Sequence, residues 1–422
     1  MPSPEGLASV HAMLATSPRL PLAALVLAIG AMAAGCGKSA HVQPSLAGPG
    51  ARVAPVAAEG AVSVTTRNTT RLGGADAATD AAAVARTVYP GFTSATRPQA
   101  VVLVDERDWP AALASAALAG APLGAPLLYA AGEDLPAVSA QTLQAMHPTG
   151  ASALGGAQVI RVGTTAAVPP GYLVHALAAA EPAAQAAEVA QLLLRADGGT
   201  APRAVIVLAA GAPRKVQMPA AGLAAESGAP VLFVTTAHVP RATASVLAAL
   251  HRPSIYVIGS ALVGAHTLGR LTRFGPVTSL TSGVAPAHEG GPAVANAIAV
   301  ARFSDGTFGW GVKEPGHGLV FMNENRPLDA PASALLSAGG DYGPQLLLED
   351  AGQVPAAVAA YLGDIQPAFT PAVPAVRAVY NHGWLIGDER AISAVTQAEI
   401  DSMLEISPRK QSSEEQSSPP VE

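Results

Sequence analysis

Three short stretches of the sequence share a proline followed by apolar residues: Gly124-Ala125-Pro126-Leu127-Leu128, Gly228-Ala229-Pro230-Val231-Leu232 and Tyr342-Gly343-Pro344-Gln345-Leu346. An apolar run precedes each stretch, at residues 100–104, 204–208 and 318–322. Another apolar run, ending in glycine, follows each stretch, at residues 159–163, 255–259 and 384–387. Because the same landmarks recur three times in the same order, the sequence indicates an internal threefold repeat.

Segments with the composition of helices separate these apolar runs. The segment between the first and second runs carries a proline near its start, where a helix tolerates it well, at Pro110, Pro219 and Pro331. A helix is also expected before each first run, at residues 76–88, 182–196 and 292–303. Short apolar strands that alternate with helices are typical of parallel sheets buried on both faces. The sequence therefore predicts an α/β protein of three tandem Rossmann-like modules, each a small parallel sheet with helices on both faces, arranged in a row or a closed triangle.

The repeat and the composition of the ends divide the chain into six expected segments. We expect a lipoprotein signal peptide at residues 1–35, a flexible tether at 36–62, repeat 1 at 63–170, repeat 2 at 171–274, an elaborated repeat 3 at 275–406 and a disordered tail at 407–422. The Gly/Pro/Ala-rich composition after residue 36 supports the tether, and the Ser/Glu/Pro-rich composition at the far end supports the tail.

Composition excludes several classes of function. The chain has 422 residues, of which 50% are hydrophobic, and a net charge of −6. It contains no long tract of basic residues, which argues against nucleic acid as a partner. A single cysteine rules out a disulfide framework and a multi-cysteine metal site.

That cysteine, Cys36, ends an apolar segment at residues 20–34 that follows Arg19. The segment is short for a membrane-spanning helix, which needs about 20 residues, but it fits the apolar part of a signal peptide. The small residues Ala33-Ala34-Gly35 before Cys36 resemble a bacterial lipobox, although Ala33 stands where that family usually has Leu. The resemblance implies that Cys36 is lipidated and anchors the protein to the outer side of the cell membrane. The alternative is a plain secretory signal with an incidental cysteine.

Several motifs lie in a familiar order between residues 64 and 391. They are Arg71-Leu72-Gly73-Gly74-Ala75-Asp76, the helix start Trp109-Pro110-Ala111-Ala112-Leu113, the strand motifs Pro126-Leu127-Leu128 and Pro230-Val231-Leu232, and the closing pairs Gly163-Thr164, Gly259-Ser260 and Gly387-Asp388. This order resembles the cell wall-binding repeat type 2 family of bacterial surface proteins. The resemblance implies three tandem modules that pack together and bind a cell-wall polymer, often an anionic one, without a covalent bond.

Candidate ligand-binding residues lie in the loops after the first strands, because ligands of open parallel sheets bind beyond the carboxyl ends of the strands. Each such loop carries a cation, and guanidinium groups suit phosphate or carboxylate. The candidates in these loops are Arg107, Arg214, Lys215, Asn323, Asn325 and Arg326. Trp310 is added because its ring suits stacking on a sugar. The alternative is that the cations are ordinary solvated charges and that Trp310 anchors its loop to the core.

Motifs of the common enzyme classes are missing from the sequence. It has no Gly-x-Ser-x-Gly nucleophile elbow, no dinucleotide fingerprint after the first strands, and no histidine spacing of a zinc site. We therefore expect no catalysis, cofactor or metal. The expected function is noncovalent binding of a cell-wall or envelope polymer by a membrane-anchored lipoprotein. A small-solute receptor for a transporter and a structural envelope spacer remain the alternatives.

Overall fold

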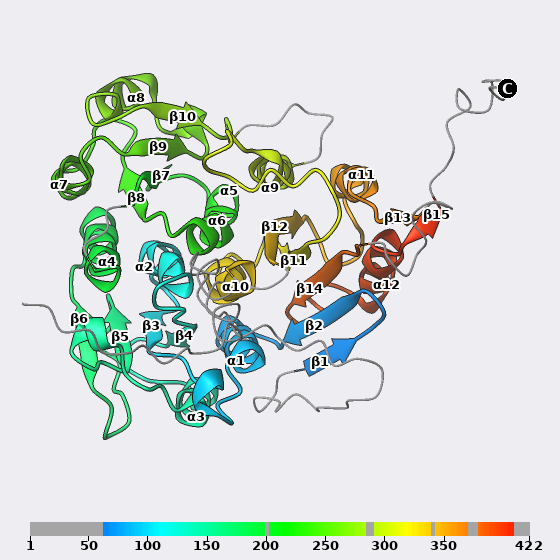
Figure 1. Cartoon of the computed structure of the whole chain (residues 1–422), viewed down its shortest axis with the longest axis horizontal. Helices are drawn as coiled ribbons and strands as arrows, with labels where there is room; N and C mark the ends of the chain where they lie inside the picture. Colours follow the sequence, from blue (N-terminus) through cyan, green and yellow to red (C-terminus); the bar gives the residue numbers. More distant parts are fainter. Residues whose placement is uncertain (1–61, 199–201, 284–290, 339–341, 370–378, 409–422) are drawn as a thin grey trace, which may run out of the picture. The chain divides into compact units, whose positions relative to one another are not determined.

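A computed structural model describes residues 62–198, 202–283, 291–338, 342–369 and 379–408. The chain divides into two units, Met1–Ala40 and His41–Glu422, and every described residue belongs to the second. Within that unit the protein is mixed α/β, with parallel sheets flanked by helices (Figure 1).

The first sheet contains four parallel strands in the spatial order β4-β3-β5-β6. The strands are β3 (Val101–Asp105), β4 (Leu127–Ala130), β5 (Val159–Val162) and β6 (Val174–Leu177). Between them lie α2 (Trp109–Ser115) with its 3₁₀ continuation η2 (Ala116–Ala119), α3 (Ala137–Met146) and η3 (Ser152–Leu154), while α1 (Ala77–Val88) and η1 (Ser94–Thr96) precede β3. Since the chain reverses direction across the sheet after β4, right-handed crossovers place α2 and α3 on opposite faces.

The second sheet repeats this order as β8-β7-β9-β10, again with all strands parallel. Its strands are β7 (Ala204–Ala209), β8 (Val231–Val234), β9 (Ser254–Val257) and β10 (Val277–Ser279). The helices that precede and connect them are α4 (Pro182–Ala196), α5 (Arg214–Gln217), α6 (Ala220–Ser227), α7 (Arg241–Ala249), η4 (Ser260–Leu262) and α8 (Ala265–Leu271).

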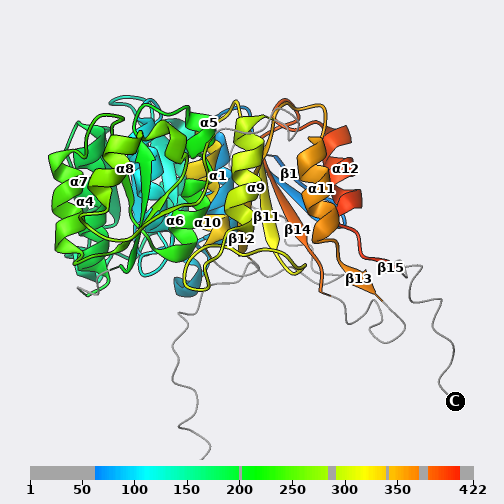
Figure 2. The ribbon, with the colours of Figure 1, turned by 90° about the horizontal axis from the view of Figure 1, so that it is seen from above.

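The third sheet is built from both ends of the described chain. Its order is β12-β11-β14-β2-β1, and β2 pairs parallel with β14, while β1 is antiparallel to β2. Its strands are β1 (Val62–Thr65), β2 (Thr69–Gly73), β11 (Gly318–Asn323), β12 (Tyr342–Leu348) and β14 (His382–Ile386). The helices are α9 (Pro292–Arg302), α10 (Asp329–Ser337), α11 (Ala356–Asp364) and α12 (Ala394–Met403), and Figure 2 shows α9, α11 and α12 standing along this sheet. Strand β2 therefore takes the place that the fourth strand has in the other two sheets.

The three prolines that led the repeat are buried at the starts of edge strands. Pro126 and Pro230 come directly before β4 and β8, and Pro344 lies inside β12. Proline lacks the N–H that a central strand needs for pairing on both sides, so an edge strand is where it is tolerated. The next prolines, Pro136 and Pro240, with Pro355, are the N-caps of α3, α7 and α11.

Two strand pairings cross the segment boundaries expected from the sequence. Strand β6 lies after residue 171 but joins the first sheet, and β2 lies within residues 63–170 but joins the third. At the other end, β15 (Ser407–Pro408) pairs with β13 (Ala368–Phe369), so the expected tail begins with two residues in a strand. Each of these strands pairs with the exposed edge of a sheet, and the sequence pattern does not reveal which edge lies nearby in space.

Helices from all three sheets meet in the centre. Helix α6 packs against both η2 and α10, and α10 also packs against η2 and α2 (Figure 1). The helix that follows each fourth strand contacts the preceding sheet's helices, as α4 does with α2, α9 with α5, and α1 with α10. These contacts form a closed circle of sheets rather than a row.

Candidate functional site

The loops after β3, β7 and β11 carry the predicted cations, and the structure brings these loops together. The Trp109 Nε1 atom donates to Gln217 Oε1 at 2.6 Å and so joins α2 to α5. The Tyr129 hydroxyl at the end of β4 donates to the Leu328 carbonyl at 2.7 Å. Because both bonds link carboxyl ends of strands from different sheets, the three loops lie on one face of the unit.

Arg107 is paired inside its own loop. Its Nη2 atom lies 2.6 Å from Asp105 Oδ2, and its Nε donates to Asp105 Oδ1 at 3.0 Å. The hydrogen bond from Arg107 lowers the pKa of the Asp105 carboxyl, which keeps the pair ionised. The arginine side chain is 73% exposed, so the pair presents little net charge to a polyanion.

Arg214 and Lys215 differ in their surroundings although they are neighbours. Lys215 Nζ donates to Glu324 Oε1 at 2.6 Å, and this glutamate is nearly buried. The bond joins the second and third sheets. Arg214 is exposed, and in the described part of the chain its side chain has no hydrogen-bond or ion-pair partner. Arg214 is thus the predicted cation that is open to a ligand.

Arg326 lies between two buried carboxyl groups. Its Nε donates to Asp329 Oδ2 at 2.9 Å, its Nη2 bonds to Asp80, and its Nη1 donates to the Ala75 carbonyl at 3.2 Å. Burial and the neighbouring Asp329 raise the pKa of Asp80 to about 9. Burial likewise raises the pKa of Asp329. One arginine with two carboxyls that share a proton is neutral, which is the arrangement that a buried site favours.

Asn323 and Asn325 shape the loop rather than face a ligand. The Asn323 Nδ2 atom donates to the Ala391 carbonyl at 3.0 Å, and its Oδ1 accepts from the Asn325 backbone N–H at 2.9 Å. The Asn325 Nδ2 atom donates to the Glu349 carbonyl at 3.0 Å. These bonds fasten the end of β11 to the segments after β12 and β14.

Trp310 lies near the amino ends of the third sheet's strands, whereas Asn323–Arg326 lie at the carboxyl end of β11, so the structure does not bring them together. Its ring is 6.0 Å from that of Tyr342, with an interplanar angle of 41°. The exposed fractions of Tyr342, Val379 and Tyr380 are 42%, 57% and 47%. We call Trp310, Tyr342, Val379 and Tyr380 the aromatic rim.

Backbone contacts hold the aromatic rim in place. His317, directly before β11, lies with its Nδ1 atom 3.3 Å from the Tyr342 carbonyl, and its own carbonyl accepts from the His382 N–H at 2.9 Å. The buried Asn381 side chain accepts from the Gly316 N–H at 2.8 Å. Sequence reasoning found Trp310 by its rarity and noted the stretch from Tyr380 to Trp384 as suited to stacking on sugars, but it took Tyr342, the first residue of β12, only as part of a strand motif.

The motif Arg71 to Asp76, quoted for the family resemblance, has a structural role here. The Arg71 side chain is buried and donates from Nη1 to the Gly387 and Asp388 carbonyls at 3.1 and 2.9 Å. Asp76 caps α1 by accepting from the Thr79 N–H at 2.9 Å. The arginine therefore fastens β2 to the third sheet.

The structure does not describe the residues on which several other predictions rest, and the searches for metal clusters and membrane-spanning helices cover only the described residues. The signal segment with Cys36, the tether up to residue 61 and the tail from residue 409 all lie outside the described residues. Within those residues, no cluster of three or more His, Cys, Asp or Glu side chains could hold a metal ion. None of the helices there is long and apolar enough to cross a membrane.

Two solved structures have a similar fold. Cwp6 from Clostridium difficile superposes with a TM-score of 0.59 at 16% identity, over 82% of this chain and 51% of that chain. Cwp8 from Clostridium difficile gives a TM-score of 0.59 at 15% identity, over 81% of this chain and 52% of that chain. This chain thus spans about half the length of each. No protein-family model matches the sequence, and no curated protein matches it.

Proposed function

We propose that the protein is a surface lipoprotein that attaches noncovalently to a cell-wall or envelope polymer, without catalysis or a cofactor. The observation that carries this proposal is the similarity in fold to Cwp6 and Cwp8, cell wall proteins of Clostridium difficile. The likeness fits a cell-wall-associated role at the cell surface. The four parallel strands of each sheet follow the same spatial pattern, and we interpret the three sheets as three tandem Rossmann-like repeats of the cell wall-binding type. The fourth parallel strand of the third repeat is β2, from the start of the described chain.

The charges on the loop face favour a limited role for electrostatics in this attachment. Arg107, Lys215 and Arg326 each have a carboxylate partner, and only Arg214 among the predicted cations is free of one in the described residues. The three predicted cationic loops should therefore attract a polyanion less strongly than the sequence suggests. Exposed ion pairs contribute little, and their cations are already partly neutralised.

The aromatic rim is the better candidate for contact with a sugar. Tyr342 and Tyr380 are exposed, while Trp310 is partly buried against the core with its ring 6.0 Å from that of Tyr342. Exposed apolar patches on a protein surface often mark interaction sites. Tyrosine and tryptophan rings offer an apolar face with a polar edge, which suits the alternating C–H and hydroxyl surfaces of a pyranose. The Trp310 ring contacts the Tyr342 ring, and the Tyr342 carbonyl contacts the His317 side chain, so these two rings are partly ordered before binding.

Co-sedimentation with wall material from the native host tests this proposal. The full chain is mixed with purified wall sacculi before and after chemical removal of the anionic polymer. We expect the doubly substituted Tyr342→Ala, Tyr380→Ala protein to lose at least about tenfold in retention, as hot-spot aromatics do. The matched control is Phe92→Ala, because Phe92 is exposed but lies elsewhere.

Each outcome has a definite meaning. Equal retention of the rim variant and the control would overturn the rim as the contact. No retention of the wild-type chain on either kind of sacculus would overturn polymer attachment and favour an envelope spacer or a solute receptor. The anchor is tested separately, by incorporation of labelled palmitate and by membrane fractionation. A Cys36→Ala chain is expected to lose both signals, and its retention of either would remove the lipoprotein assignment.

A further inference from the structure

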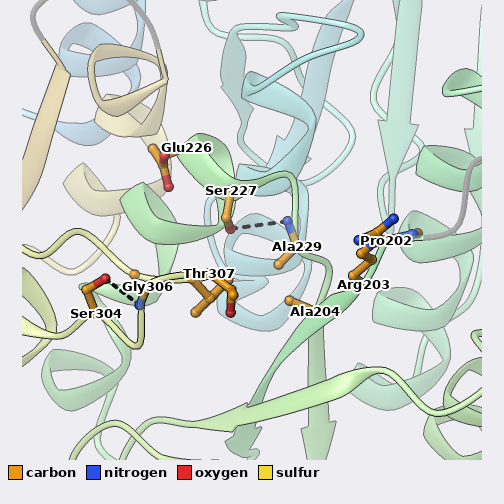
Figure 3. Close-up of a pocket in the computed structure, with 11 residues that line it drawn as sticks. Pro202, Arg203, Ala204, Glu226, Ser227, Ala229, Ser304, Gly306 and Thr307 are labelled. Atoms are coloured by element: carbon orange, nitrogen blue, oxygen red, sulfur yellow. Dashed lines mark hydrogen bonds between the residues drawn. The ribbon is translucent and has the colours of Figure 1, made fainter.

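A cavity of about 450 Å³ lies between the second sheet and the loop that leads to the third. One wall is the start of β7 with Arg203 and the end of α6 with Glu226 and Ser227, and the other is the loop at Ser304–Gly309 (Figure 3). The cavity opens at the amino ends of the strands, away from the loop face that carries Arg107 and Arg214. Its volume is in the range of small-molecule sites.

The loop wall is held in one shape. Asp305 Oδ1 accepts from the backbone N–H groups of Thr307 and Phe308 at 2.9 Å each, and its Oδ2 accepts from the Tyr256 hydroxyl at 2.6 Å. The Phe308 ring stacks on Tyr256 of β9 with centroids 4.0 Å apart and 12° between planes. At Gly309 a Cβ atom would lie 2.5 Å from the Phe303 carbonyl oxygen, so only glycine fits at this position of the loop. The wall is therefore preformed by contacts with the second sheet.

The two charged groups of the cavity have opposite sign and no partners. In the described part of the chain, neither the Arg203 nor the Glu226 side chain has a hydrogen-bond or ion-pair partner. Figure 3 shows them on opposite sides of the lining, with Ser227 and Thr307 between them. Burial raises the pKa of the Glu226 carboxyl, because desolvation disfavours its charged form.

The end of α6 adds to the preference for a cation beside Glu226. Helix α6 ends at Ser227, and its last carbonyl groups carry the negative end of the helix dipole. A carboxylate there is poorly placed for the helix, whereas an ammonium group would satisfy both the carboxylate and the carbonyls. Arg203 on the other side is suited to a carboxylate, which its guanidinium can hold through paired hydrogen bonds.

We propose that this cavity binds a small zwitterion with a free ammonium group at one end and a free carboxylate at the other, such as a dipeptide. Glu226 and the end of α6 take the ammonium, and Arg203 takes the carboxylate. The hydroxyl groups of Ser304 and Thr307 and the ring of Phe308 line the space between. None of the four rim residues lines this cavity, although Trp310 directly follows Gly309, and the proposal does not depend on polymer attachment.

Calorimetric titration of the full chain with alanyl-alanine at neutral pH tests the proposal. N-acetyl-alanyl-alanine lacks the cation, and alanyl-alaninamide lacks the carboxylate. Each is expected to bind at least about tenfold more weakly than the free dipeptide, as expected for the loss of one charged hydrogen bond. Glu226→Gln should abolish the preference for a free ammonium, and Arg203→Gln the preference for a free carboxylate.

Matched controls and a fold check make the outcome decisive. Glu314→Gln and Arg241→Gln remove the same kinds of charge at exposed positions outside the cavity and should leave all three affinities unchanged. Unchanged thermal midpoints show that the variants fold. The absence of heat with alanyl-alanine, equal binding of the blocked dipeptides, or tighter binding of a neutral disaccharide would each overturn the proposal.

Discussion

Arg326, in the loop after β11, bonds to Asp80 in α1, which lies 246 residues earlier in the chain. The same guanidinium bonds to Asp329 in the first turn of α10. Both carboxyl groups are almost fully buried. The pair therefore closes the circle of sheets at the point where the beginning of the described chain meets the third sheet.

Replacing Arg326 should destabilise the fold strongly. In Arg326→Gln two buried carboxyls lose their cation, and we expect a loss of about 3 kcal/mol in the free energy of unfolding, as for other broken buried pairs. Denaturant unfolding followed by circular dichroism measures the change. The control is Arg390→Gln, because the Arg390–Asp388 pair is exposed and should contribute less than about 1 kcal/mol. Similar losses in the two variants would contradict the assigned role of Arg326.

The contribution of Asp80 to the stability of the protein should fall as pH rises between about 4 and 9. Burial and the neighbouring Asp329 raise the pKa of Asp80 to about 9 in the folded protein, whereas its ordinary value is 3.8. In this interval the folded protein binds the proton that the unfolded chain has released. The free energy of unfolding contributed by this group is therefore greatest below pH 4 and decreases as pH rises through the interval.

An Asp80→Asn variant isolates that contribution. Asparagine cannot ionise but can still accept the hydrogen bond from the Gly74 N–H, which reaches Asp80 Oδ1 at 2.6 Å. We expect the variant to have a flatter dependence of denaturation midpoint on pH than the wild type. Parallel profiles for the two proteins would show that Asp80 does not hold an extra proton.

The centre of the unit should not tolerate a methyl group at Gly120. A Cβ atom there would lie 1.9 Å from the Ala225 carbonyl, so η2 and α6 would have to separate. We expect Gly120→Ala to cost about 1–3 kcal/mol, as overpacking generally does. In contrast, Gly269 lies inside α8 with nothing within 4 Å of a Cβ, and Gly269→Ala should stabilise by about 0.5–1 kcal/mol. Thermal unfolding of both variants gives the comparison, and a neutral Gly120→Ala would argue against the close approach.

Arg214 and Lys215 should separate attachment from stability. Arg214→Gln is expected to weaken retention on anionic wall polymer severalfold at low salt, with little effect at high salt, because an exposed charge is screened. Lys215→Gln should instead lower stability by about 1 kcal/mol, since it leaves the nearly buried Glu324 without its partner. Sedimentation and denaturation of both variants, with wild type alongside, check this division. Equal retention of the Arg214→Gln and wild-type chains at low salt would remove the last loop cation from the proposed function.

Much of the fold follows from the sequence because its strands are short, apolar and marked by proline. The predicted runs at residues 100–104 and 204–208 correspond closely to β3 and β7, and the helix expected at residues 182–196 is α4. Strands β2, β6 and β10 were not predicted, because they are short and carry Thr, Arg, His or Ser among their apolar residues. Which sheet an edge strand joins depends on contacts far apart in the chain, and periodicity carries no such information.

The candidate site was less predictable than the fold. The sequence places a cation after each first strand, and the acids beside Arg107 already predict that this cation is partly neutralised. It does not show that Glu324 pairs with Lys215 or that Asp80 pairs with Arg326, because these carboxylates come from distant segments. The partner of Arg326 is the single acid in an Ala-rich helix, Asp80, whose isolation in an apolar segment was the one available signal. The cavity proposed for a zwitterion combines Arg203 and Glu226 with the loop at Ser304–Gly309 that leads to the third sheet, so no local sequence motif predicts it.

The pairing of β2 with β14 has a consequence for the order of biosynthesis. Strand β2 lies near the start of the described chain and is synthesised early, yet its parallel neighbour β14 ends only at Ile386. Contacts between residues so distant in sequence form late in folding, because the entropy cost of closing a long loop comes before the stabilising contacts are made. The first two sheets need only strands that lie close together in the sequence, whereas the third sheet of a nascent chain cannot be completed until the chain has been translated as far as Ile386.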